Sequence, residues 1–196
     1  MANPGFQEIA ATAARLFLTL GFRGVSLRAI ASELGIQAAS LYHHCPGGKS
    51  ELYLRSVRWF LDGYAERLLA ARGKASFPES LLRMATFTLG DNHVDIRRIV
   101  TEDLPNLPEA QQQDLSRWLH EGLLRPFVLE FDAAKRAGKA RSRLDSPMAA
   151  ACVLAIADNI GGLHLPANTS PCAEDLQSAA QLVRAGLQLL LDGARP

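Results

Sequence analysis

The sequence predicts an all-α fold, because apolar residues recur at helical spacing in almost every segment and no run alternates as a half-buried β-strand would. Glycines and prolines divide the chain into segments of ordinary helix length. Pro126 falls inside the longest of them and should kink or split it. Besides the pair of short helices described next, the expected helices cover residues 6–20, 49–71, 79–91, 94–103, 108–137, 147–163 and 174–191.

The most informative stretch runs from Ser26 to Lys49 and predicts a helix-turn-helix. Ser26 is a good N-cap for a short helix, because its hydroxyl can accept a hydrogen bond from an unpaired amide. Gly35 turns the chain, and a second short helix follows over residues 37–44 until Pro46 ends it. The first helix would support the second, and the second would present an exposed face to the major groove, which is the arrangement of a DNA-binding helix-turn-helix.

Composition limits the other function classes. The chain has 196 residues, 48% of them hydrophobic, which is enough for one large domain or two small ones. No stretch approaches about 18 uncharged apolar residues, and the N-terminus lacks the pattern of a signal peptide, so we expect a cytoplasmic protein without a membrane span. Three scattered cysteines do not suggest a disulfide framework.

The charge is nearly balanced, at +1 overall. Residues 1–60 hold six basic and three acidic residues, whereas the rest of the chain holds 15 basic and 17 acidic residues. This mild excess of positive charge in the N-terminal part suits a site that contacts a few phosphates, although by itself it does not establish one.

The N-terminal residues resemble the TetR family of transcriptional regulators over about the first 55 positions. The similarity lies in Ala13-Ala14-Arg15-Leu16-Phe17, in the turn around Gly35, and in the block Leu41-Tyr42-His43-His44-Cys45-Pro46-Gly47-Gly48-Lys49. Cys45 stands where the family usually has phenylalanine, which should loosen the packing beneath the second short helix. Ser50 replaces a usual acid and should be tolerated as a capping residue.

The resemblance implies a helix-turn-helix domain over residues 1–50 and a helical ligand-binding and dimerisation domain over residues 51–196. It also implies contacts with phosphates, sugars and base edges of double-stranded operator DNA. Gln37 could pair with adenine, and Arg28 is the better candidate for guanine because the second short helix has no arginine. The candidate DNA-binding residues are Ser26, Arg28, Gln37, Ala38, Ala39, Ser40, Tyr42, His43 and Lys49.

The last two expected helices are poor in charge, and from residue 147 to residue 165 only Asp158 is charged. Helices apolar on several faces need a second partner besides their own core. In TetR-like proteins the corresponding helices pair in a homodimer, which would present two recognition helices about 34–36 Å apart to a palindrome. The candidate interface residues are Met148, Ala151, Cys152, Ala155, Ile156, Asn159, Leu176, Ala180, Val183 and Leu187.

By the same resemblance, a pocket among the middle helices binds a small effector, and the absence of dense charge favours a mostly apolar one. The candidate lining residues are aromatic or imidazole side chains: Trp59, Phe60, Tyr64, Phe87, His93, Trp118, Phe127 and Phe131. A place in the core is the more common role for each of them, since aromatic residues at helical spacing usually pack.

The function expected is therefore a homodimeric repressor that a small ligand releases from DNA. An activator of the same fold and a thiol-based redox sensor remain alternatives. An enzyme is the alternative from another class, but no metalloprotease, nucleophile-elbow, phosphate-loop or dinucleotide motif occurs. We expect no cofactor and no metal.

Overall fold

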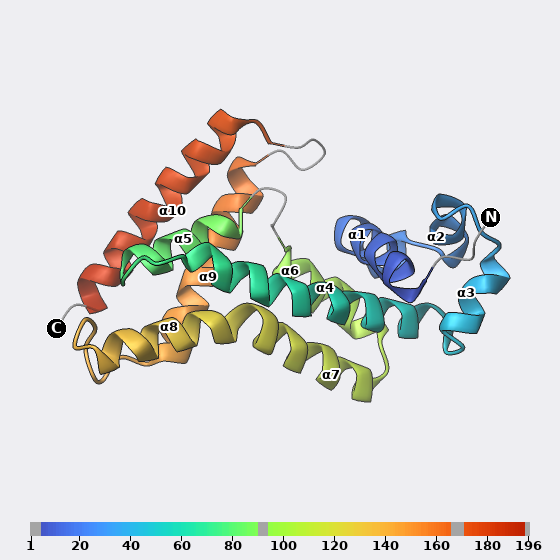
Figure 1. Cartoon of the computed structure of the whole chain (residues 1–196), viewed down its shortest axis with the longest axis horizontal. Coiled ribbons are helices and arrows are strands. Elements are labelled where there is room, and N and C mark those ends of the chain that lie inside the picture. The colour runs from blue at the N-terminus through green and yellow to red at the C-terminus, as the bar shows by residue number, and fades with distance from the viewer. Residues whose placement is uncertain (1–4, 90–93, 166–170, 195–196) are drawn as a thin grey trace. The chain divides into compact units, whose positions relative to one another are not determined.

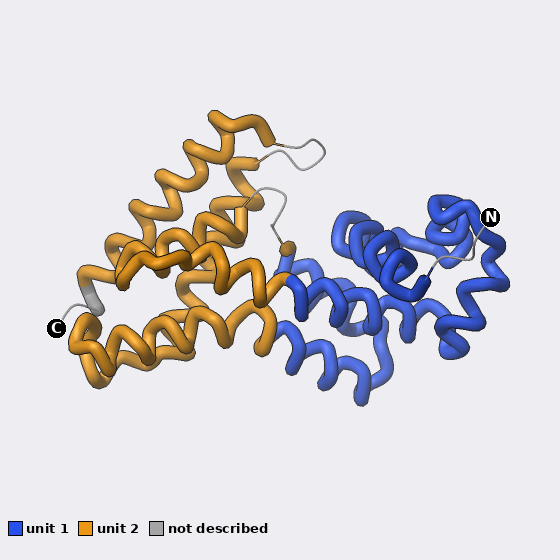
Figure 2. The backbone as a smooth tube through the Cα atoms, in the orientation of Figure 1, with its two compact units in different colours: residues 1–63, 95–119 blue, residues 64–94, 120–196 orange. Residues whose placement is uncertain are grey.

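The computed structural model describes residues 5–89, 94–165 and 171–194, and over these it is helical, with no strand (Figure 1). The prediction of an all-α fold is confirmed. The chain divides into two compact units (Figure 2): unit 1 comprises Met1–Gly63 with Asp95–Leu119, and unit 2 comprises Tyr64–Val94 with His120–Pro196. Both units draw on the long helix α4, Gly48–Arg72. The functional boundary expected after residue 50 stays a prediction.

Unit 1 begins with the three N-terminal helices and includes a later stretch of the chain that packs against α1. That later stretch starts as α-helix, passes through a π-helical turn and a 3-10 turn, and continues as α7. Besides the first part of α4, the elements are α1 (Phe6–Gly24), α2 (Leu27–Glu33), α3 (Ala38–His44), α6 (Ile96–Arg98), η2 (Ile99–Asp103), η3 (Leu104–Asn106) and α7 (Glu109–Leu119).

Local signals place the first helices as predicted. The Ser26 hydroxyl accepts a hydrogen bond of 3.1 Å from the backbone N–H of Ala29, which caps α2. Gly35 turns the chain between α2 and α3 with φ +65°. The assigned α1 extends to Gly24, but Gly21 has non-helical angles (φ 74°, ψ 167°), so the regular helix ends where the sequence predicts.

The start of α4 is capped differently from the expectation. Ser50 lies inside α4, and the side chain that accepts a hydrogen bond from the preceding loop is that of Glu51, at 2.7 Å from the N–H of Gly47. A carboxylate in the first turn also opposes the positive end of the helix dipole. The capping role predicted for Ser50 is therefore wrong, because the helix begins two residues earlier, at Gly48.

An aromatic cluster forms part of the core of unit 1. The ring of Tyr53 meets the rings of Phe17 and Phe22 edge to face, with centroids 5.1 and 5.3 Å apart. Tyr53 and Phe17 are fully buried. Along α4 one stripe of residues is buried, at helical spacing: Leu52, Val57, Leu61, Tyr64 and Leu68.

Unit 2 is a helical assembly in which α9 packs against both α8 and α10, and α5 contacts all three. The predicted break at Pro126 is confirmed. The segment 108–137 is divided by a π-helical turn, and α8 starts with Pro126 in its first turn, where a missing N–H breaks no helical hydrogen bond. Besides the rest of α4, the elements are α5 (Glu79–Phe87), η4 (His120–Leu124), α8 (Arg125–Arg136), α9 (Ser146–His164) and α10 (Ala173–Ala194).

Helix α5 is shorter than the predicted segment 79–91. It ends at Phe87, where the Thr88 hydroxyl donates a 2.7 Å hydrogen bond to the carbonyl of Ala85. A threonine side chain that bonds back to the preceding turn competes with helix continuation. Residues 90 and 91 lie outside the described part of the chain.

Helix α9 is the most apolar element of unit 2. Over an 18-residue window its mean hydropathy is 1.3. Among the described residues it is the one helix that is long and apolar enough, by length and composition, to cross a membrane. The sequence predicted no span, and α9 is the stretch that comes nearest to one. Its central place between α8 and α10 is that of a core helix, yet only a third of that window is buried.

Candidate nucleic-acid interface

Helices α2 and α3 form the predicted helix-turn-helix in unit 1. Ile30 and Ala31 of α2 and Leu41 of α3 are buried, so one face of each helix belongs to the core. The side chain of Arg15 pairs with that of Glu33 and joins α1 to the end of α2. The opposite face of α3 is left for a ligand.

The candidate DNA-binding residues lie on exposed or half-buried positions of this motif. Tyr42 is 52% exposed although it is large and partly apolar, and His43 beside it is also exposed. Gln37 precedes α3 as its N-cap, but its side chain makes no capping hydrogen bond, so the amide is available to a partner. Exposed with them are Ser26, Arg28 and Ala39, whereas Ala38 and Ser40 are half-buried.

The side chain of Lys49 is half-buried and contacts an aromatic ring, whereas the sequence suggests an exposed lysine. Its ammonium lies 4.5 Å from the centroid of the Phe22 ring, within range of a cation–π contact. Partial burial lowers the pKa of Lys49, an effect that the carboxylate of Asp103 opposes. Its predicted phosphate contact would have to compete with this contact to Phe22.

The C-terminal end of α3 is fixed by Arg55 of α4. The Arg55 guanidinium donates hydrogen bonds to the carbonyl of His44 and, at 3.7 Å, to the sulfur of Cys45, and it also lies over the ring of Phe6. Cys45 is buried, and burial raises the pKa of its thiol. Burial with a raised pKa does not favour the thiolate that oxidants attack.

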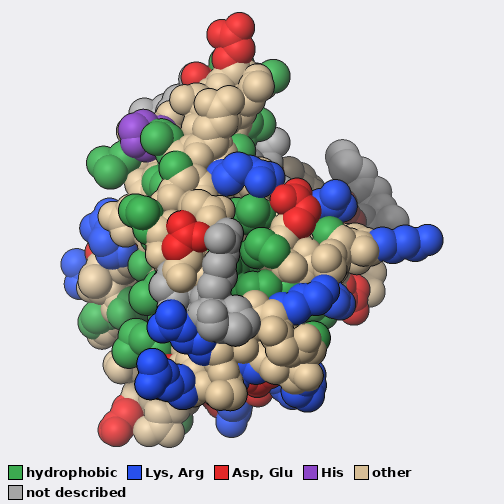
Figure 3. Space-filling view, turned by 90° about the vertical axis from the view of Figure 1, so that its left-hand side faces the viewer, with side chains coloured by type: hydrophobic (Ala, Val, Ile, Leu, Met, Phe, Trp, Pro, Cys, Tyr) green, Lys and Arg blue, Asp and Glu red, His purple; other side chains and the backbone are tan. Residues whose placement is uncertain are grey.

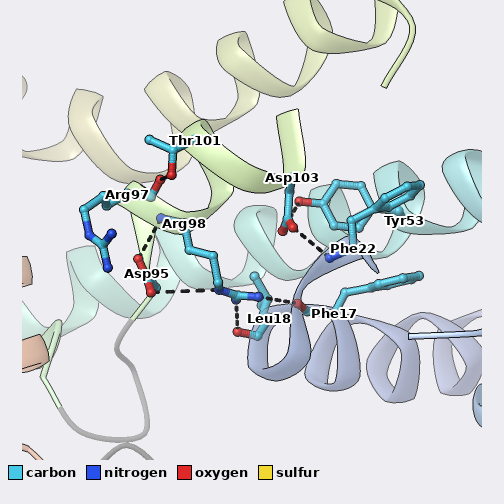
Figure 4. A network of polar contacts seen from close by, with 9 residues as sticks. All are labelled: Phe17, Leu18, Phe22, Tyr53, Asp95, Arg97, Arg98, Thr101 and Asp103. Atoms are coloured by element: carbon cyan, nitrogen blue, oxygen red, sulfur yellow. Dashed lines mark hydrogen bonds and ion pairs between the residues drawn. The ribbon is translucent and has the colours of Figure 1, made fainter. Parts of the chain in front are cut away.

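A buried polar network that the sequence did not reveal joins the end of α1 to α6 and η2 (Figure 4). The Asp103 carboxylate accepts hydrogen bonds from the N–H of Phe22 (2.7 Å) and from the hydroxyl of Tyr53 (3.1 Å). Arg98 donates to the carbonyls of Phe17 and Leu18, which lie in the last regular turn of α1. No local pattern signals this network, because its partners lie 50 to 81 residues apart in the sequence.

The predicted dimer residues fall into two groups. Val183 and Leu187 are fully buried inside unit 2, so a partner chain cannot reach them. On α9 the exposed or half-buried ones are Met148, Ala151, Cys152, Ala155, Ile156 and Asn159, and on α10 Leu176 and Ala180 are half-buried.

Other apolar residues on these helices are still more exposed. Leu163 on α9 is 78% exposed and Leu189 on α10 is 79% exposed, and the sequence did not single out either residue. The space-filling view of this end of the chain shows hydrophobic side chains gathered along its left-hand edge (Figure 3).

The structure does not gather the predicted ligand-binding residues around one cavity. Phe127, Phe131 and Tyr64 are buried core residues, and the rings of Tyr64 and Phe87 pack 5.5 Å apart. Trp59 is exposed, Phe60 is half-buried, and Trp118 lies beneath the guanidinium of Arg58. His93 lies outside the described residues.

A pocket does occur in unit 2, between α5 and α10, with a volume of about 560 Å³. Of the predicted ligand-binding residues that the structure describes, Phe87 alone lines it. The other lining side chains include arginine and glutamine, which are not part of an aromatic pattern in the sequence. They are Leu82, Arg83, Thr86, Gln177, Ala180, Gln181 and Arg184.

Comparison with known proteins identifies the N-terminal segment. Residues 9–55 match the model of the family described as bacterial regulatory proteins, tetR family. The HTH-type transcriptional regulator LmrA of Bacillus subtilis (strain 168) is 41% identical over 51 residues, which are 26% of this chain and 27% of LmrA. The chain therefore matches only about a quarter of the length of this curated relative.

Solved structures extend the similarity of fold to both units. AibR, crystallised with isovaleryl coenzyme A and operator DNA, superposes with a TM-score of 0.65 at 22% identity and covers 92% of this chain and 96% of its own. A putative transcriptional regulator from Saccharomonospora viridis, in complex with choline, gives a TM-score of 0.72 at 22% identity, with 93% and 95% covered. The helix-turn-helix of α2 and α3 agrees with the family match over residues 9–55, so this N-terminal segment has the helix-turn-helix of the tetR family of bacterial regulatory proteins, and the solved structures share the fold of both units.

Proposed function

We propose that this protein is a cytoplasmic transcriptional repressor that binds a palindromic DNA operator as a homodimer and is released by a small ligand. The observation that carries the proposal is the exposed face of α3, where Tyr42 and His43 project from a helix otherwise held by its own core. A large aromatic side chain left in solvent on a recognition helix is well suited to a nucleic-acid surface, and among related folds the AibR structure holds operator DNA.

The chemistry of α3 favours a particular mode of reading. The helix contains no lysine or arginine, so bidentate contacts to guanine from α3 are excluded. Gln37 is the side chain suited to adenine, and the methyl groups of Ala38 and Ala39 suit the methyl group of thymine. With so few direct contacts, phosphate contacts and DNA shape should carry a large share of the affinity.

The dimer part of the proposal rests on the exposed apolar residues of α9 and α10. Met148 and Leu163 lie on α9, and Leu182 and Leu189 lie on α10, each more than a third exposed. Between the two α9 residues the exposed positions are small, including Ala151 and Ala155, which lets a second helix approach closely. Large exposed apolar residues gathered on two neighbouring helices are typical of an interaction site.

The ligand part rests on the pocket of unit 2 and on the related folds. The AibR structure contains isovaleryl coenzyme A, and the Saccharomonospora viridis structure contains choline. A ligand releases DNA only if it prefers the conformation that fits the operator less well.

A gel-shift titration of the purified protein against the DNA upstream of its own gene tests the proposal. We expect a sequence-selective shift that a scrambled fragment of equal length does not give, and that weakens as salt is raised. A reporter gene under the same DNA then separates repression from activation. Equal affinity for the scrambled fragment would contradict the proposal.

A further inference from the structure

The pocket between α5 and α10 has the size of a small-molecule site. Its volume of about 560 Å³ lies within the range usual for pockets that bind small organic ligands. Two neighbouring turns of each helix line it, so its walls are regular secondary structure whose backbone hydrogen bonds are made within the helices. Its chemistry must therefore come from side chains.

Two of these side chains are arginines that share one carboxylate. Arg83 Nε lies 3.5 Å from Glu79 Oε1, and Arg184 Nη2 lies 3.3 Å from Glu79 Oε2. One glutamate neutralises only one of the two guanidiniums, so this group carries a surplus positive charge at the pocket. All three side chains are between 43% and 59% exposed, and exposed ion pairs of this kind hold together only weakly.

The remaining walls are of two kinds. Leu82 and Phe87 on α5 supply an apolar surface next to the charged group. Gln177 and Gln181 on α10 are one turn apart and so face the same way, and neither side chain makes a hydrogen bond to another described residue. An apolar wall, two free amides and an unbalanced pair of arginines together match a molecule with an apolar part and an acidic end.

The pocket stays accessible in the proposed dimer. Residues of an α-helix advance by about 100° each, so Arg184 and Leu182 point about 160° apart around α10. Leu189, one heptad beyond Leu182, lies on the same side as Leu182. A partner chain that covers the two leucines would leave the face with Arg184 open, and Ala180, which the sequence assigned to the interface, would lie on this open face instead.

We propose that this pocket binds a small organic anion, with its acidic group on Arg83 and Arg184 and its apolar part against Leu82 and Phe87. This inference gives a chemical class to the ligand of the proposed function and rests on that proposal for its regulatory meaning, whereas binding itself does not depend on DNA. It also changes the expectation of a mostly apolar effector: the apolar part is retained, and an acidic group is added. In the binding of an organic anion, charge-assisted hydrogen bonds between guanidinium and carboxylate are the strong, directional contacts.

Calorimetric titration of the full chain without DNA tests the inference, with octanoate, 1-octanol and acetate as probes. Octanoate should bind with a Kd at least about tenfold below that of octanol, which lacks the charge, or acetate, which lacks the apolar part. Arg83→Gln and Arg184→Gln should each weaken the binding of octanoate at least about tenfold and leave the affinity for octanol unchanged. Arg136→Gln, which removes an exposed charge from α8 instead, should change neither.

Three results would overturn the inference: no binding of alkanoates of four to ten carbons at millimolar concentration, equal binding of octanoate and octanol, or full affinity in both pocket variants. Circular dichroism of each variant checks that it is folded. A gel shift in the presence of octanoate then addresses the proposed function separately. Octanoate that binds through Arg83 and Arg184 but leaves the DNA complex intact supports the anion site and contradicts ligand release.

Discussion

The Tyr53 hydroxyl donates a hydrogen bond of 3.1 Å to the buried carboxylate of Asp103 and so links α4 to η2 within unit 1. Asp103 is 2% exposed, and its other oxygen accepts the N–H of Phe22. A buried carboxylate costs free energy unless hydrogen bonds replace the water that it loses. Tyr53 therefore stabilises unit 1 through its hydroxyl as well as through its ring.

Replacing Tyr53 by phenylalanine keeps the ring and removes the hydroxyl. We expect Tyr53→Phe to lower the free energy of unfolding by about 1–3 kcal/mol, because the Asp103 carboxylate stays buried with one partner fewer. Urea denaturation followed by circular dichroism measures the change. Tyr42→Phe removes an exposed hydroxyl and is the matched control, expected within about 0.5 kcal/mol of the parent. Equal losses in the two variants would show that the bond to Asp103 contributes nothing.

The same hydroxyl predicts a loss of stability at alkaline pH. Burial, together with the Asp103 charge and the hydrogen bond to it, raises the pKa of Tyr53 above its usual value, and burial likewise raises the pKa of Tyr64. In the unfolded chain tyrosine loses its proton near pH 10, whereas the folded protein retains both protons well above that pH. The contribution of these two tyrosines to the free energy of unfolding is therefore constant below about pH 10 and falls above it, by up to about 1.4 kcal/mol per pH unit for each buried tyrosine.

Urea denaturation between pH 8 and pH 11 measures this dependence. In Tyr53→Phe the slope above pH 10 should be shallower than in the parent, because one of the two buried tyrosines that titrate there is gone. An unchanged slope in that variant would mean that Tyr53 titrates normally in the folded protein.

Two glycines with positive φ allow backbone strain and steric clash to be separated. A Cβ on Gly35 would meet no atom within 4 Å, so Gly35→Ala should cost only the strain of a positive φ, about 1–2 kcal/mol. A Cβ on Gly21 would lie 2.7 Å from Arg98 Nη1 and 3.2 Å from Asp103 Oδ1, and its φ and ψ fall in a region almost restricted to glycine.

We therefore expect Gly21→Ala to lower the melting temperature by several degrees more than Gly35→Ala, since about 1 kcal/mol corresponds to about 2–4 °C in a chain of this size. Thermal unfolding followed by circular dichroism compares the two. A smaller loss in Gly21→Ala would mean that the Arg98 side chain moves aside without cost.

How far the sequence predicts the structure depends on how local the cause is. The capping by Ser26, the turn at Gly35 and the break at Pro126 are decided within a few residues, and all three were predicted. The π-helical turns that begin at Ile99 and His120 were not, because no local signal in the sequence marks such a turn.

The candidate sites divide in the same way. The exposed positions of α3 follow from helical periodicity, whereas the aromatic residues assigned to a ligand pocket, such as Phe127 and Phe131, turned out to be core, because packing is what aromatic side chains most often do. The pairing of Arg184 with Glu79 joins positions 105 residues apart and leaves no trace in a local pattern.

The exposed leucines of α9 and α10 predict which substitutions would break the proposed dimer. Leu163→Glu or Leu189→Glu would bury a carboxylate against an apolar partner, so each variant should shift the protein to monomers, as measured by light scattering after size exclusion. Leu129→Glu on α8 changes an exposed leucine elsewhere and should leave the assembly unchanged. Full dimerisation of both α9 and α10 variants would mean that other residues form the interface.

The recognition helix predicts two different effects on DNA binding. Tyr42→Ala should weaken binding to all operator sequences by a similar factor, because a contact with sugar and phosphate carries no sequence information. Gln37→Ala should instead relax the choice at one or two base pairs, at a cost of about 1–3 kcal/mol for the preferred base only. Gln113→Ala, an exposed glutamine on α7, makes the same substitution away from α3 and should change neither affinity nor choice. Gel shifts against a set of single-base operator variants distinguish the two patterns, and the same uniform loss in the Tyr42 and Gln37 variants would refute this division of roles along α3.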